Sequence, residues 1–295
     1  MRAAVVGANG QLGSDICYVY REAGGSVIEL DHDAIDITDF GQCLEVINKH
    51  APDIIINTAA MHNVELCEEW PEKSFLVNGI GARNLALVSR NLRIPVVHFS
   101  TDYVFDGRRR IPYVEDDTPL PLNVYGNTKL SGELFIRNIA DSYFIVRVSG
   151  LYGHAACRAK GGVNFVRLML RLAGERDAIR VVDDEVLSPT FTLSIAEQLE
   201  RLTRTERYGV YHIASEGSCS WYEFAKKIFE ISDIEVDLNI ASPEEFPSKA
   251  ARPKYSVLEN RKLESEQLNV MPHWETGLRR YLMSLEPSLY AKNRK

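Results

Sequence analysis

Short apolar runs recur along the first half of the chain, and each gives way to a polar residue or a glycine. They lie at residues 3–6, 27–30, 53–58, 95–100 and 143–148. The segments between them predict helices that begin near Leu12, Thr38, Glu72 and Tyr125, the third running unbroken over residues 72–89. Strands with continuous apolar runs, separated by helices, form parallel sheets covered on both faces. The pattern therefore predicts a doubly wound α/β domain over residues 1–150.

The second half of the chain has shorter runs and more loops. Helices are predicted over residues 164–172, 220–231 and 273–285, and short strands over residues 179–182 and 210–214. The second helix opens on a capping box formed by Ser220 and Glu223. We interpret residues 151–295 as a smaller mixed α/β domain over the carboxyl edge of the sheet, where ligands bind in such folds. Residues 179–215 are expected to return to the first domain and extend its sheet.

Composition narrows the class of protein. The chain has 295 residues, 45% of them hydrophobic, with 34 Lys+Arg against 41 Asp+Glu. This apolar content excludes a disordered chain, and the acidic balance argues against a nucleic-acid partner. No segment approaches the roughly 20 apolar residues of a membrane helix. The five scattered cysteines predict reduced thiols and a cytoplasmic protein, and neither they nor the seven histidines form a metal motif.

A glycine-rich loop follows the first predicted strand and opens the first helix. Gly7 permits the tight turn, Gly10 lets backbone N–H groups approach a pyrophosphate, and Gly13 permits close packing of helix and strand. Asp31 ends the second strand, 18 residues after Gly13, where a carboxylate accepts hydrogen bonds from a ribose diol. A glycine-rich turn without a ligand is the alternative. Because a predicted strand precedes the loop and a predicted helix follows it, we favour a Rossmann dinucleotide site.

The residues around Asp31 bear on the choice of cofactor. Asp31 and Asp33 flank His32, and no Arg or Lys stands nearby. The 2′-phosphate of NADPH would meet like charge there, so we expect a preference for NADH over NADPH. Asp36 and Ile37, before the next helix, are candidate contacts of the adenine ring.

Tyr125 and Lys129 are four residues apart at a predicted helix start, which places both on one face of the helix. A phenol has a pKa of about 10, and a nearby ammonium favours its phenolate, so the pair is suited to passing a proton near pH 7. This spacing alone is common on helix surfaces. It indicates a catalytic pair more strongly when it follows a dinucleotide-binding loop in the same chain.

A second polar cluster ends the fourth predicted strand, at the sheet edge where catalytic groups collect. The Thr101 hydroxyl is expected to donate to a carbonyl oxygen as negative charge builds there, and Asp102 and Tyr103 to grip sugar hydroxyls. The alternative is that Ser100 and Thr101 merely cap a turn. Together with Tyr125 and Lys129, the cluster favours a Thr–Tyr–Lys reductase centre.

Several motifs together resemble the extended short-chain dehydrogenase/reductases and, within them, the dTDP-4-dehydrorhamnose reductases. They are the glycine loop at residues 7–13, Asn-Thr-Ala-Ala at residues 57–60, Ser-Thr-Asp-Tyr-Val-Phe at residues 100–105, Tyr-Gly-Asn-Thr-Lys at residues 125–129 and Ala-Arg-Pro at residues 251–253. The resemblance covers nearly the whole chain. It implies an NAD(P)H-dependent reduction of a nucleotide-activated 4-keto-6-deoxy sugar.

The resemblance also implies roles for single residues. Tyr125 would donate the proton, Lys129 would hold the nicotinamide ribose and tune Tyr125, and Thr101 would complete the triad. Thr101 and Asp102 would touch the sugar. Arg252 would meet the substrate diphosphate or form a structural salt bridge. The cofactor would be lined by Gly7, Gly10, Gln11, Leu12, Gly13, Asp31, Asp36, Ile37, Ala59, Ala60, Met61, His62, Tyr125 and Lys129.

Gly150 departs from the family pattern, which often has Trp in this loop. This departure keeps open a non-catalytic subunit that resembles the partner of methionine adenosyltransferase. A sugar-nucleotide epimerase, which retains its cofactor while the keto sugar rotates, is a further alternative to the reductase. Some relatives hold magnesium between subunits, and Asp15 stands near such a position, but we predict no metal site. The sequence does not determine the oligomeric state, for which a homodimer is one alternative.

Overall fold

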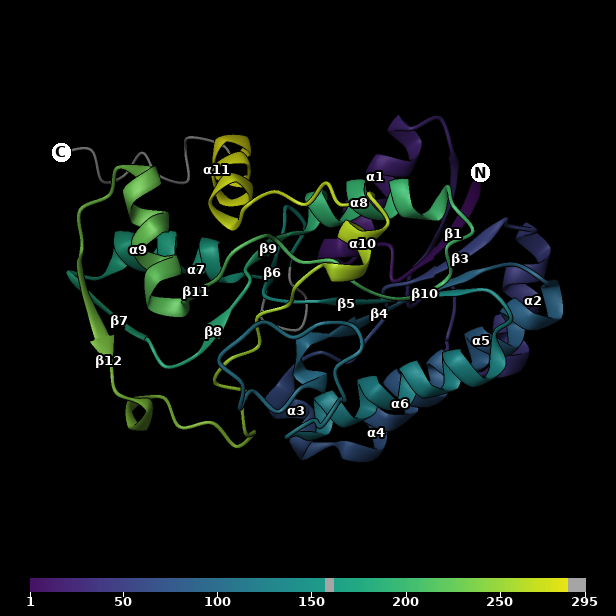
Figure 1. Cartoon of the computed structure of the whole chain (residues 1–295), viewed down its shortest axis with the longest axis horizontal. Helices are drawn as coiled ribbons and strands as arrows, with labels where there is room; N and C mark the ends of the chain where they lie inside the picture. The colour runs from purple at the N-terminus through teal and green to yellow at the C-terminus, as the bar shows by residue number, and fades with distance from the viewer. Residues whose placement is uncertain (157–161, 286–295) are drawn as a thin grey trace.

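The computed structural model describes residues 1–156 and 162–285, and its centre is a parallel sheet (Figure 1). Within the described residues this sheet has six strands in the order β2-β1-β3-β4-β5-β10. They are β1 (Arg2–Val6), β2 (Ser26–Leu30), β3 (Ile54–Asn57), β4 (Val96–Thr101), β5 (Tyr143–Val148) and β10 (Gly209–His212). All neighbours run parallel. The predicted doubly wound α/β fold is confirmed.

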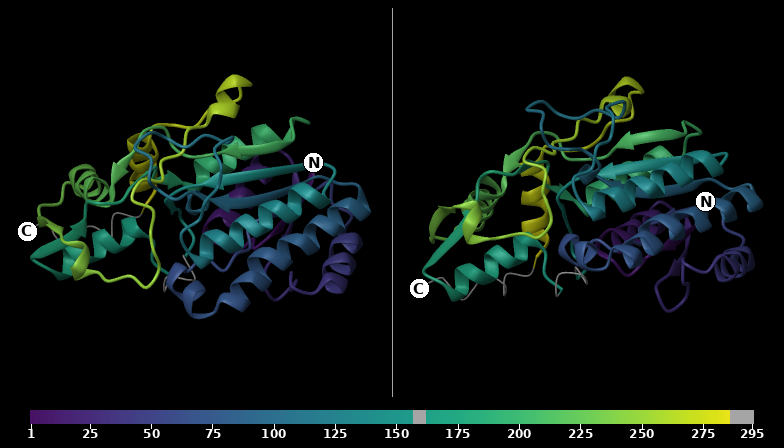
Figure 2. Two further views of the ribbon diagram at one scale, coloured as in Figure 1. Left: turned by 60° about the horizontal axis from the view of Figure 1, so that its bottom comes forward. Right: turned by 90° about the horizontal axis from the view of Figure 1, so that it is seen from below.

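Helices cover both faces of the sheet (Figure 2). The elements on one face are α1 (Gln11–Glu22) and α8 (Thr192–Thr203), and those on the other are α2 (Phe40–His50), α5 (Gly81–Leu92) and α6 (Val124–Ile139). Successive residues of β4 point to opposite faces: Val97 belongs to the core cluster that contains Ile16 of α1, and Val96 to the cluster that contains Leu85 of α5. Since both faces are covered, the strand is apolar throughout rather than alternating.

The helix expected over residues 72–89 is not one regular helix. The chain instead forms α3 (Val64–Glu69), α4 (Pro71–Phe75), the π-helical turn η1 (Leu76–Ile80) and α5. Trp70 ends α3 and precedes the N-terminal proline of α4. In η1 the side chain of Asn78 turns back to bond the backbone of Met61. This tertiary contact holds the π turn at the point where the sequence predicts an uninterrupted helix.

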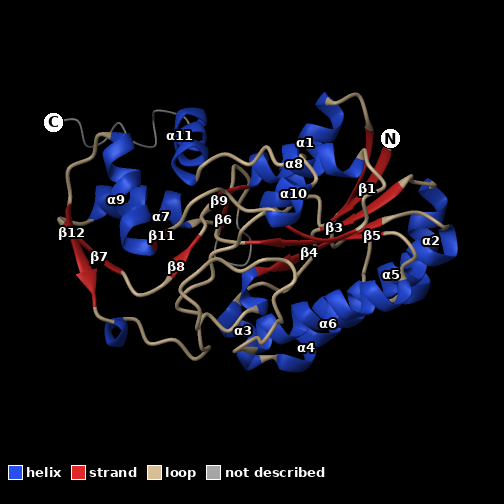
Figure 3. Ribbon diagram, viewed as in Figure 1, coloured by secondary structure: helices blue, strands red, loops and turns tan. Residues whose placement is uncertain are grey.

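The second part of the chain packs around an aromatic cluster, and its helices and short strands lie beside one end of the central sheet (Figure 3). Tyr152, Phe191 and Tyr281 lie with ring centroids 5.2 to 5.8 Å apart. The capping box of Ser220 and Glu223 is present as predicted. The helices are α7 (Phe165–Glu175), α9 (Trp221–Ser232) and α11 (Trp274–Ser284). The paired strands are β6 (Leu151–Tyr152) with β9 (Thr190–Phe191), β7 (Ala178–Val182) with β12 (Asp237–Ala241), and β8 (Val186–Leu187) with β11 (Cys219–Ser220).

Residues 179–215 are divided between the two parts. The strand β7 pairs with β12, outside the central sheet. After β9 the chain returns: α8 packs against α1, and Val210 of β10 pairs with Ile145 of β5. The return therefore begins near Thr192 rather than at residue 179. Short elements complete the described chain: η2 (Asp102–Val104), η4 (Pro243–Glu245) and α10 (Arg261–Ser265).

Among the described residues, no helix combines the length and apolar character needed to cross a membrane.

Candidate active site

The loop between β1 and α1 carries the three glycines of the predicted phosphate site. Gly7 has a φ of +81°, and a Cβ there would overlap the turn that follows β3. A Cβ on Gly13 would lie 2.3 Å from the Gly7 carbonyl oxygen, so both positions require glycine. A Cβ on Gly10 would approach only the Gly7 oxygen, at 3.3 Å. Because α1 begins at Gln11 with no capping side chain and no acid in its first turn, its N–H groups suit a pyrophosphate.

Asp31 is half-buried at the end of β2 and is fixed from two sides. Its carboxylate accepts a hydrogen bond of 3.1 Å from the Asn9 side chain in the glycine loop, and two more of 3.1 Å from backbone N–H groups of the next turn. Asp36 is exposed, whereas Ile37 is only 6% exposed and lies in the core, where a Cβ on Gly81 would meet it. The side chain of Ile37 therefore faces away from solvent, and its adenine contact stays a prediction.

The turn after β3 forms a half-exposed wall that comprises Ala59, Ala60, Met61 and His62. Asn78 of η1 binds the Met61 backbone on both sides: its oxygen accepts from the Met61 N–H at 2.9 Å, and its amide donates to the Met61 carbonyl at 2.9 Å. The amide also donates to Thr128 of α6 at 3.0 Å. The π turn thus ties this wall to the helix that carries Tyr125.

Thr101 and Asp102 lie at the carboxyl end of β4, and both are buried. The Thr101 hydroxyl donates to Asp102 at 2.9 Å, and Ser149 and Ser256 donate to the other carboxylate oxygen at 2.8 and 2.6 Å. Burial raises the pKa of Asp102, and the three hydroxyl donors oppose that rise. Because the Asp102 oxygens accept from these hydroxyls, the structure differs from the expectation that this residue reaches out to a sugar.

Tyr125 follows the start of α6, which Asn123 caps by accepting from the Gly126 N–H at 2.8 Å. Gly126 lets the helix approach η2, since a Cβ there would lie 2.2 Å from the Tyr103 carbonyl oxygen. The rings of Tyr103 and Tyr125 meet edge to face at 5.9 Å. Burial raises the pKa of Tyr125, and a hydrogen bond with Thr101 opposes that rise. The phenol is thus protonated at neutral pH, contrary to the expected shift toward phenolate.

The Thr101 proton is committed to Asp102, so Thr101 is an acceptor toward its other neighbours. It accepts from the Tyr103 N–H at 3.2 Å and lies within hydrogen-bond reach of the Tyr125 hydroxyl. In this arrangement the proton available to a ligand belongs to Tyr125. The expected donation from Thr101 to a carbonyl oxygen stays a prediction that requires its hydroxyl to rotate.

Lys129 lies one helical turn beyond Tyr125 and is only 3% exposed. Burial lowers its pKa to about 8, although the negative charge of Glu133 opposes the change. Glu133 is itself paired, with Arg147 at 2.8 Å and the Ser100 hydroxyl at 2.5 Å. The amine also lies beside His98, whose Nε2 is 3.5 Å from Lys129 Nζ.

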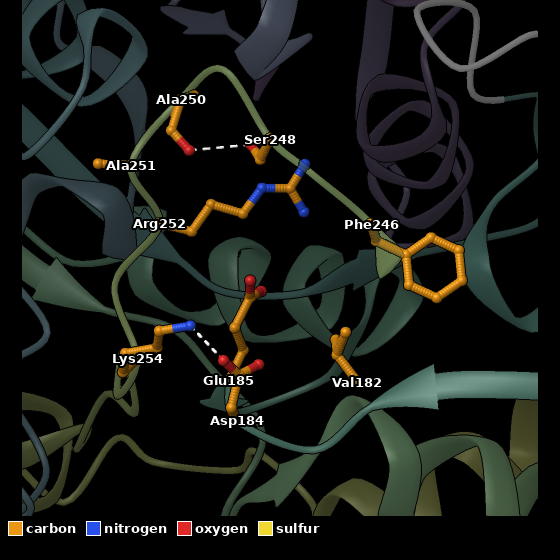
Figure 4. A pocket seen from close by; sticks show the side chains of 9 residues that line it. All are labelled: Val182, Asp184, Glu185, Phe246, Ser248, Ala250, Ala251, Arg252 and Lys254. Atoms are coloured by element: carbon orange, nitrogen blue, oxygen red, sulfur yellow. Dashed lines mark hydrogen bonds and ion pairs between the residues drawn. The ribbon is translucent and has the colours of Figure 1, made fainter. Parts of the chain in front are cut away.

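Arg252 lines a cavity of about 350 Å³ between the β7–β8 turn and residues 246–254. The Glu185 side chain extends toward Arg252, and Lys254 is paired with Asp184 (Figure 4). The Arg252 guanidinium also donates to Glu65 of α3 at 3.2 Å. The structure is therefore compatible with both predicted roles of Arg252: it forms a salt bridge, and it also faces a cavity in which a diphosphate could bind.

Gly150 has a φ of +56°, and a Cβ there would lie 2.8 Å from Leu187 and 3.0 Å from Pro189. The close packing against these residues explains why glycine occupies the position.

Sequence reasoning assigned no role to several buried polar residues that shape the site. They are Asn57, Asn78, Glu133, Ser149 and Ser256. Asn57 belongs to a motif noted in the sequence, and Glu133 follows Lys129 by one turn, so both had a signal in the sequence. Asn78 and Ser256 had none, because their contacts depend on the fold. Within the described residues no group of three or more His, Cys, Asp or Glu side chains is placed to hold a metal ion.

Comparison with known proteins agrees with this geometry. The RmlD substrate binding domain model matches residues 1–286. The spore coat polysaccharide biosynthesis protein SpsK of Bacillus subtilis is 41% identical, over 95% of this chain and 96% of that protein. A dTDP-4-keto-6-deoxy-D-glucose reductase of Streptomyces niveus is 37% identical, over 94% of this chain and 95% of that protein.

A solved structure leads to the same family. The dTDP-4-dehydrorhamnose reductase of Bacillus anthracis in complex with NADP is 40% identical, with a TM-score of 0.92 over 96% of this chain and 99% of that one. Since the family model spans almost the full length and the relatives align from end to end, the chain belongs to the RmlD substrate-binding-domain family.

Proposed function

We propose that this chain is a reductase that uses NAD(P)H to reduce the 4-keto carbon of a dTDP-activated 4-keto-6-deoxy sugar, with dTDP-4-dehydrorhamnose as the expected substrate. The observation that carries the proposal is a half-buried Tyr125 one turn from a buried lysine, in a chain whose relatives are named as reductases of such sugars. An epimerase and a non-catalytic subunit are the alternatives that the assay below separates.

The cofactor site follows from the loop geometry. The first turn of α1 and the open side of Gly10 would hold the pyrophosphate, and Asp31 would accept from the adenosine ribose. Lys129 would donate to the nicotinamide ribose. The bound nicotinamide supplies the hydride.

The chain's own residues supply the proton that the reduced carbonyl oxygen needs. As hydride reaches the carbonyl carbon, negative charge grows on the oxygen, and Tyr125 gives that oxygen its phenolic proton. Thr101 lies within hydrogen-bond reach of the Tyr125 hydroxyl and helps to orient the phenol, and Asp102 fixes Thr101 in turn. Burial keeps the proton on Tyr125 until a stronger base, the developing alkoxide, takes it.

The sugar nucleotide is assigned to the side of the site that carries Arg252. The cavity there contains one guanidinium beside Glu185, and a guanidinium binds a diphosphate through two parallel hydrogen bonds. Tyr103, whose ring abuts Tyr125, is the proposed contact of the sugar ring.

We propose NADH as the preferred cofactor, because the carboxylates of Asp31 and the exposed Asp33 oppose a 2′-phosphate. The Bacillus anthracis relative was crystallised with NADP, so the preference requires its own measurement. Calorimetric titration of both cofactors should give the lower Kd for NADH, and Asp31→Asn should narrow the difference. Tighter NADPH binding by the unaltered chain would overturn the preference.

We further propose a cytoplasmic location, supported by the cysteines within the described residues, Cys17, Cys43, Cys67 and Cys219, whose thiols are free and buried. A homodimer and the lack of a nucleic-acid partner remain predictions. Size-exclusion chromatography with light scattering tests the first, and a DNA-binding titration at low salt tests the second.

The test of the reaction uses dTDP-4-keto-6-deoxy sugars with NADH or NADPH. Loss of nicotinamide absorbance should match formation of a product two hydrogens heavier. Tyr125→Phe should lower kcat by about 10²- to 10⁴-fold, the usual contribution of a positioned acid. A change of sugar stereochemistry without net cofactor use would indicate an epimerase. Neither change, with any of these sugars, would favour the non-catalytic alternative.

A further inference from the structure

A line of buried polar groups connects the turn after β3 to Lys129. The Ala59 N–H donates to Asn57 Oδ1 at 3.1 Å, Asn57 Nδ2 lies 3.1 Å from His98 Nδ1, and His98 Nε2 lies 3.5 Å from Lys129 Nζ. The three side chains come from β3, β4 and α6 and are 1 to 3% exposed. The proposed reaction uses only the last of them.

Donor and acceptor chemistry fixes the direction of the first two hydrogen bonds in this line. A backbone N–H can only donate, so Ala59 fixes the oxygen of Asn57 on its own side and turns the Asn57 amide N–H toward His98. The ring nitrogen that faces this N–H must accept, so Nδ1 carries no proton. A neutral imidazole then has its proton on Nε2, the atom that faces Lys129.

Packing leaves the ring no alternative position. A Cβ on Gly132 of α6 would lie 2.9 Å from His98 Nε2 and 2.6 Å from the Asn78 carbonyl oxygen, so the helix backbone closes directly over the imidazole. The charged groups around this line are Lys129 itself and, on its far side, Glu133, which Arg147 neutralises. Burial and the neighbouring lysine lower the pKa of His98, which keeps the ring neutral.

We propose that Asn57 and His98 are positioning residues that hold Lys129, with the Nε2–H of His98 directed at the lone pair of the Lys129 amine when that amine is neutral. This inference rests on the proposed role of Lys129 as the ligand of the nicotinamide ribose. A lone pair occupied by His98 leaves both N–H groups of the neutral amine free to donate. The lowered pKa of Lys129 agrees with a neutral amine becoming populated near pH 8.

The tautomer of His98 can be measured without cofactor or substrate. In ¹⁵N-histidine-labelled full-length chain, the His98 ring, assigned by its loss in His98→Gln, should show the Nε2–H form and no protonation from about pH 6 to 9. Asn57→Asp offers a carboxylate that accepts from both Ala59 and His98, so it should reverse the tautomer to Nδ1–H. Asn84→Ser, which alters a buried asparagine bonded to Ile37 and Thr38 instead, should leave the His98 signals unchanged.

The same variant has a kinetic signature. With Nε2 as an acceptor in Asn57→Asp, the ammonium form of Lys129 gains a partner, and the limb of the pH–rate profile that reports Lys129 should move to higher pH by about one unit. The Nδ1–H form in the unaltered chain, or an unchanged tautomer in Asn57→Asp, would overturn the proposal. If Asn57→Asp does not fold, the tautomer of the unaltered chain decides. Lack of turnover with every sugar tested would count against the proposed function and leave the spectroscopic result valid.

Discussion

Lys129 occupies a position that is unfavourable for folding. Its pKa of about 8 against an ordinary value of 10.5 corresponds to about 3 kcal/mol of lost stability at pH 7. The sign follows from proton binding: between these two pKa values the unfolded chain holds the proton and the folded chain does not, so stability rises with pH across this range. The cost is complete below about pH 8 and has vanished near pH 10.5.

Lys129→Met should therefore stabilise the cofactor-free chain at pH 7, by on the order of 1–3 kcal/mol, while abolishing turnover. The gain should shrink as the pH rises from 8 to 10. Urea unfolding at pH 7 and pH 9.5 measures both values. Lys49→Met, at an exposed position of α2, serves as the control and should change little at either pH. A gain for Lys129→Met that does not depend on pH would show that packing, and not charge burial, limits this site.

For single residues, the sequence predicts membership of the site well. It predicts the role of each residue in the site less well. Spacing was sufficient to associate Tyr125 with Lys129, since one helical turn joins them wherever the helix lies. The direction of the Thr101 hydroxyl depends on Asp102, Ser149 and Ser256, which only the folded chain brings together. The residue types of a site can be read directly from the sequence. The pKa of Tyr125 cannot, because it is set by burial, which depends on the whole fold.

Among the elements, α6 is the one whose placement matters most for catalysis, and Gly126 sets its approach to η2. Gly126→Ala would place a methyl group 2.2 Å from the Tyr103 carbonyl oxygen. We expect a loss of about 1–3 kcal/mol in the free energy of unfolding, and a fall in kcat because Tyr125 moves with the helix. Urea unfolding and steady-state kinetics measure the two effects.

Gly174 of α7 provides the matched substitution. Its Cβ would meet nothing within 4 Å, so Gly174→Ala should stabilise the chain by about 0.5–1 kcal/mol through helix propensity alone. Stabilisation by both substitutions, or an equal loss of stability from both, would contradict the steric explanation for Gly126.

The strands and most helices of the first half were predictable because their signals are periodic and local. Continuous apolar runs identify β1, β3 and β5 as buried strands, and the glycine loop marks the start of α1. The π turn η1 was not predictable: its residues read as helix, and only the contacts of Asn78 with Met61 explain it. The pairing of β7 with β12 was missed for a similar reason, since a short strand does not specify its partner.

For the whole molecule, contacts between distant segments join the two parts of the chain at the site. Asp102 accepts from Ser149 after β5 and from Ser256 in the second part. Glu65 of α3 binds residues 248–252 through Ser248, the Lys249 N–H and Arg252. The Ser248 hydroxyl is the main cause that lowers the pKa of Glu65. This connection is therefore present above the ordinary pKa of Glu65 and is lost as the pH falls through the lowered value.

The same connection allows the two roles of Arg252 to be separated. If Arg252 binds the substrate diphosphate, Arg252→Ala should raise the KM for the sugar nucleotide by about 10- to 100-fold, the value of a charge-assisted hydrogen bond, with kcat nearly unchanged. Glu65→Gln keeps the guanidinium but weakens its attachment to α3, so it should lower Tm and raise KM by less than about threefold. Inorganic pyrophosphate should inhibit the unaltered chain and Glu65→Gln but not Arg252→Ala. Equal increases in KM from both substitutions, with pyrophosphate inhibition retained in Arg252→Ala, would instead make Arg252 a structural residue that holds residues 248–252 against α3.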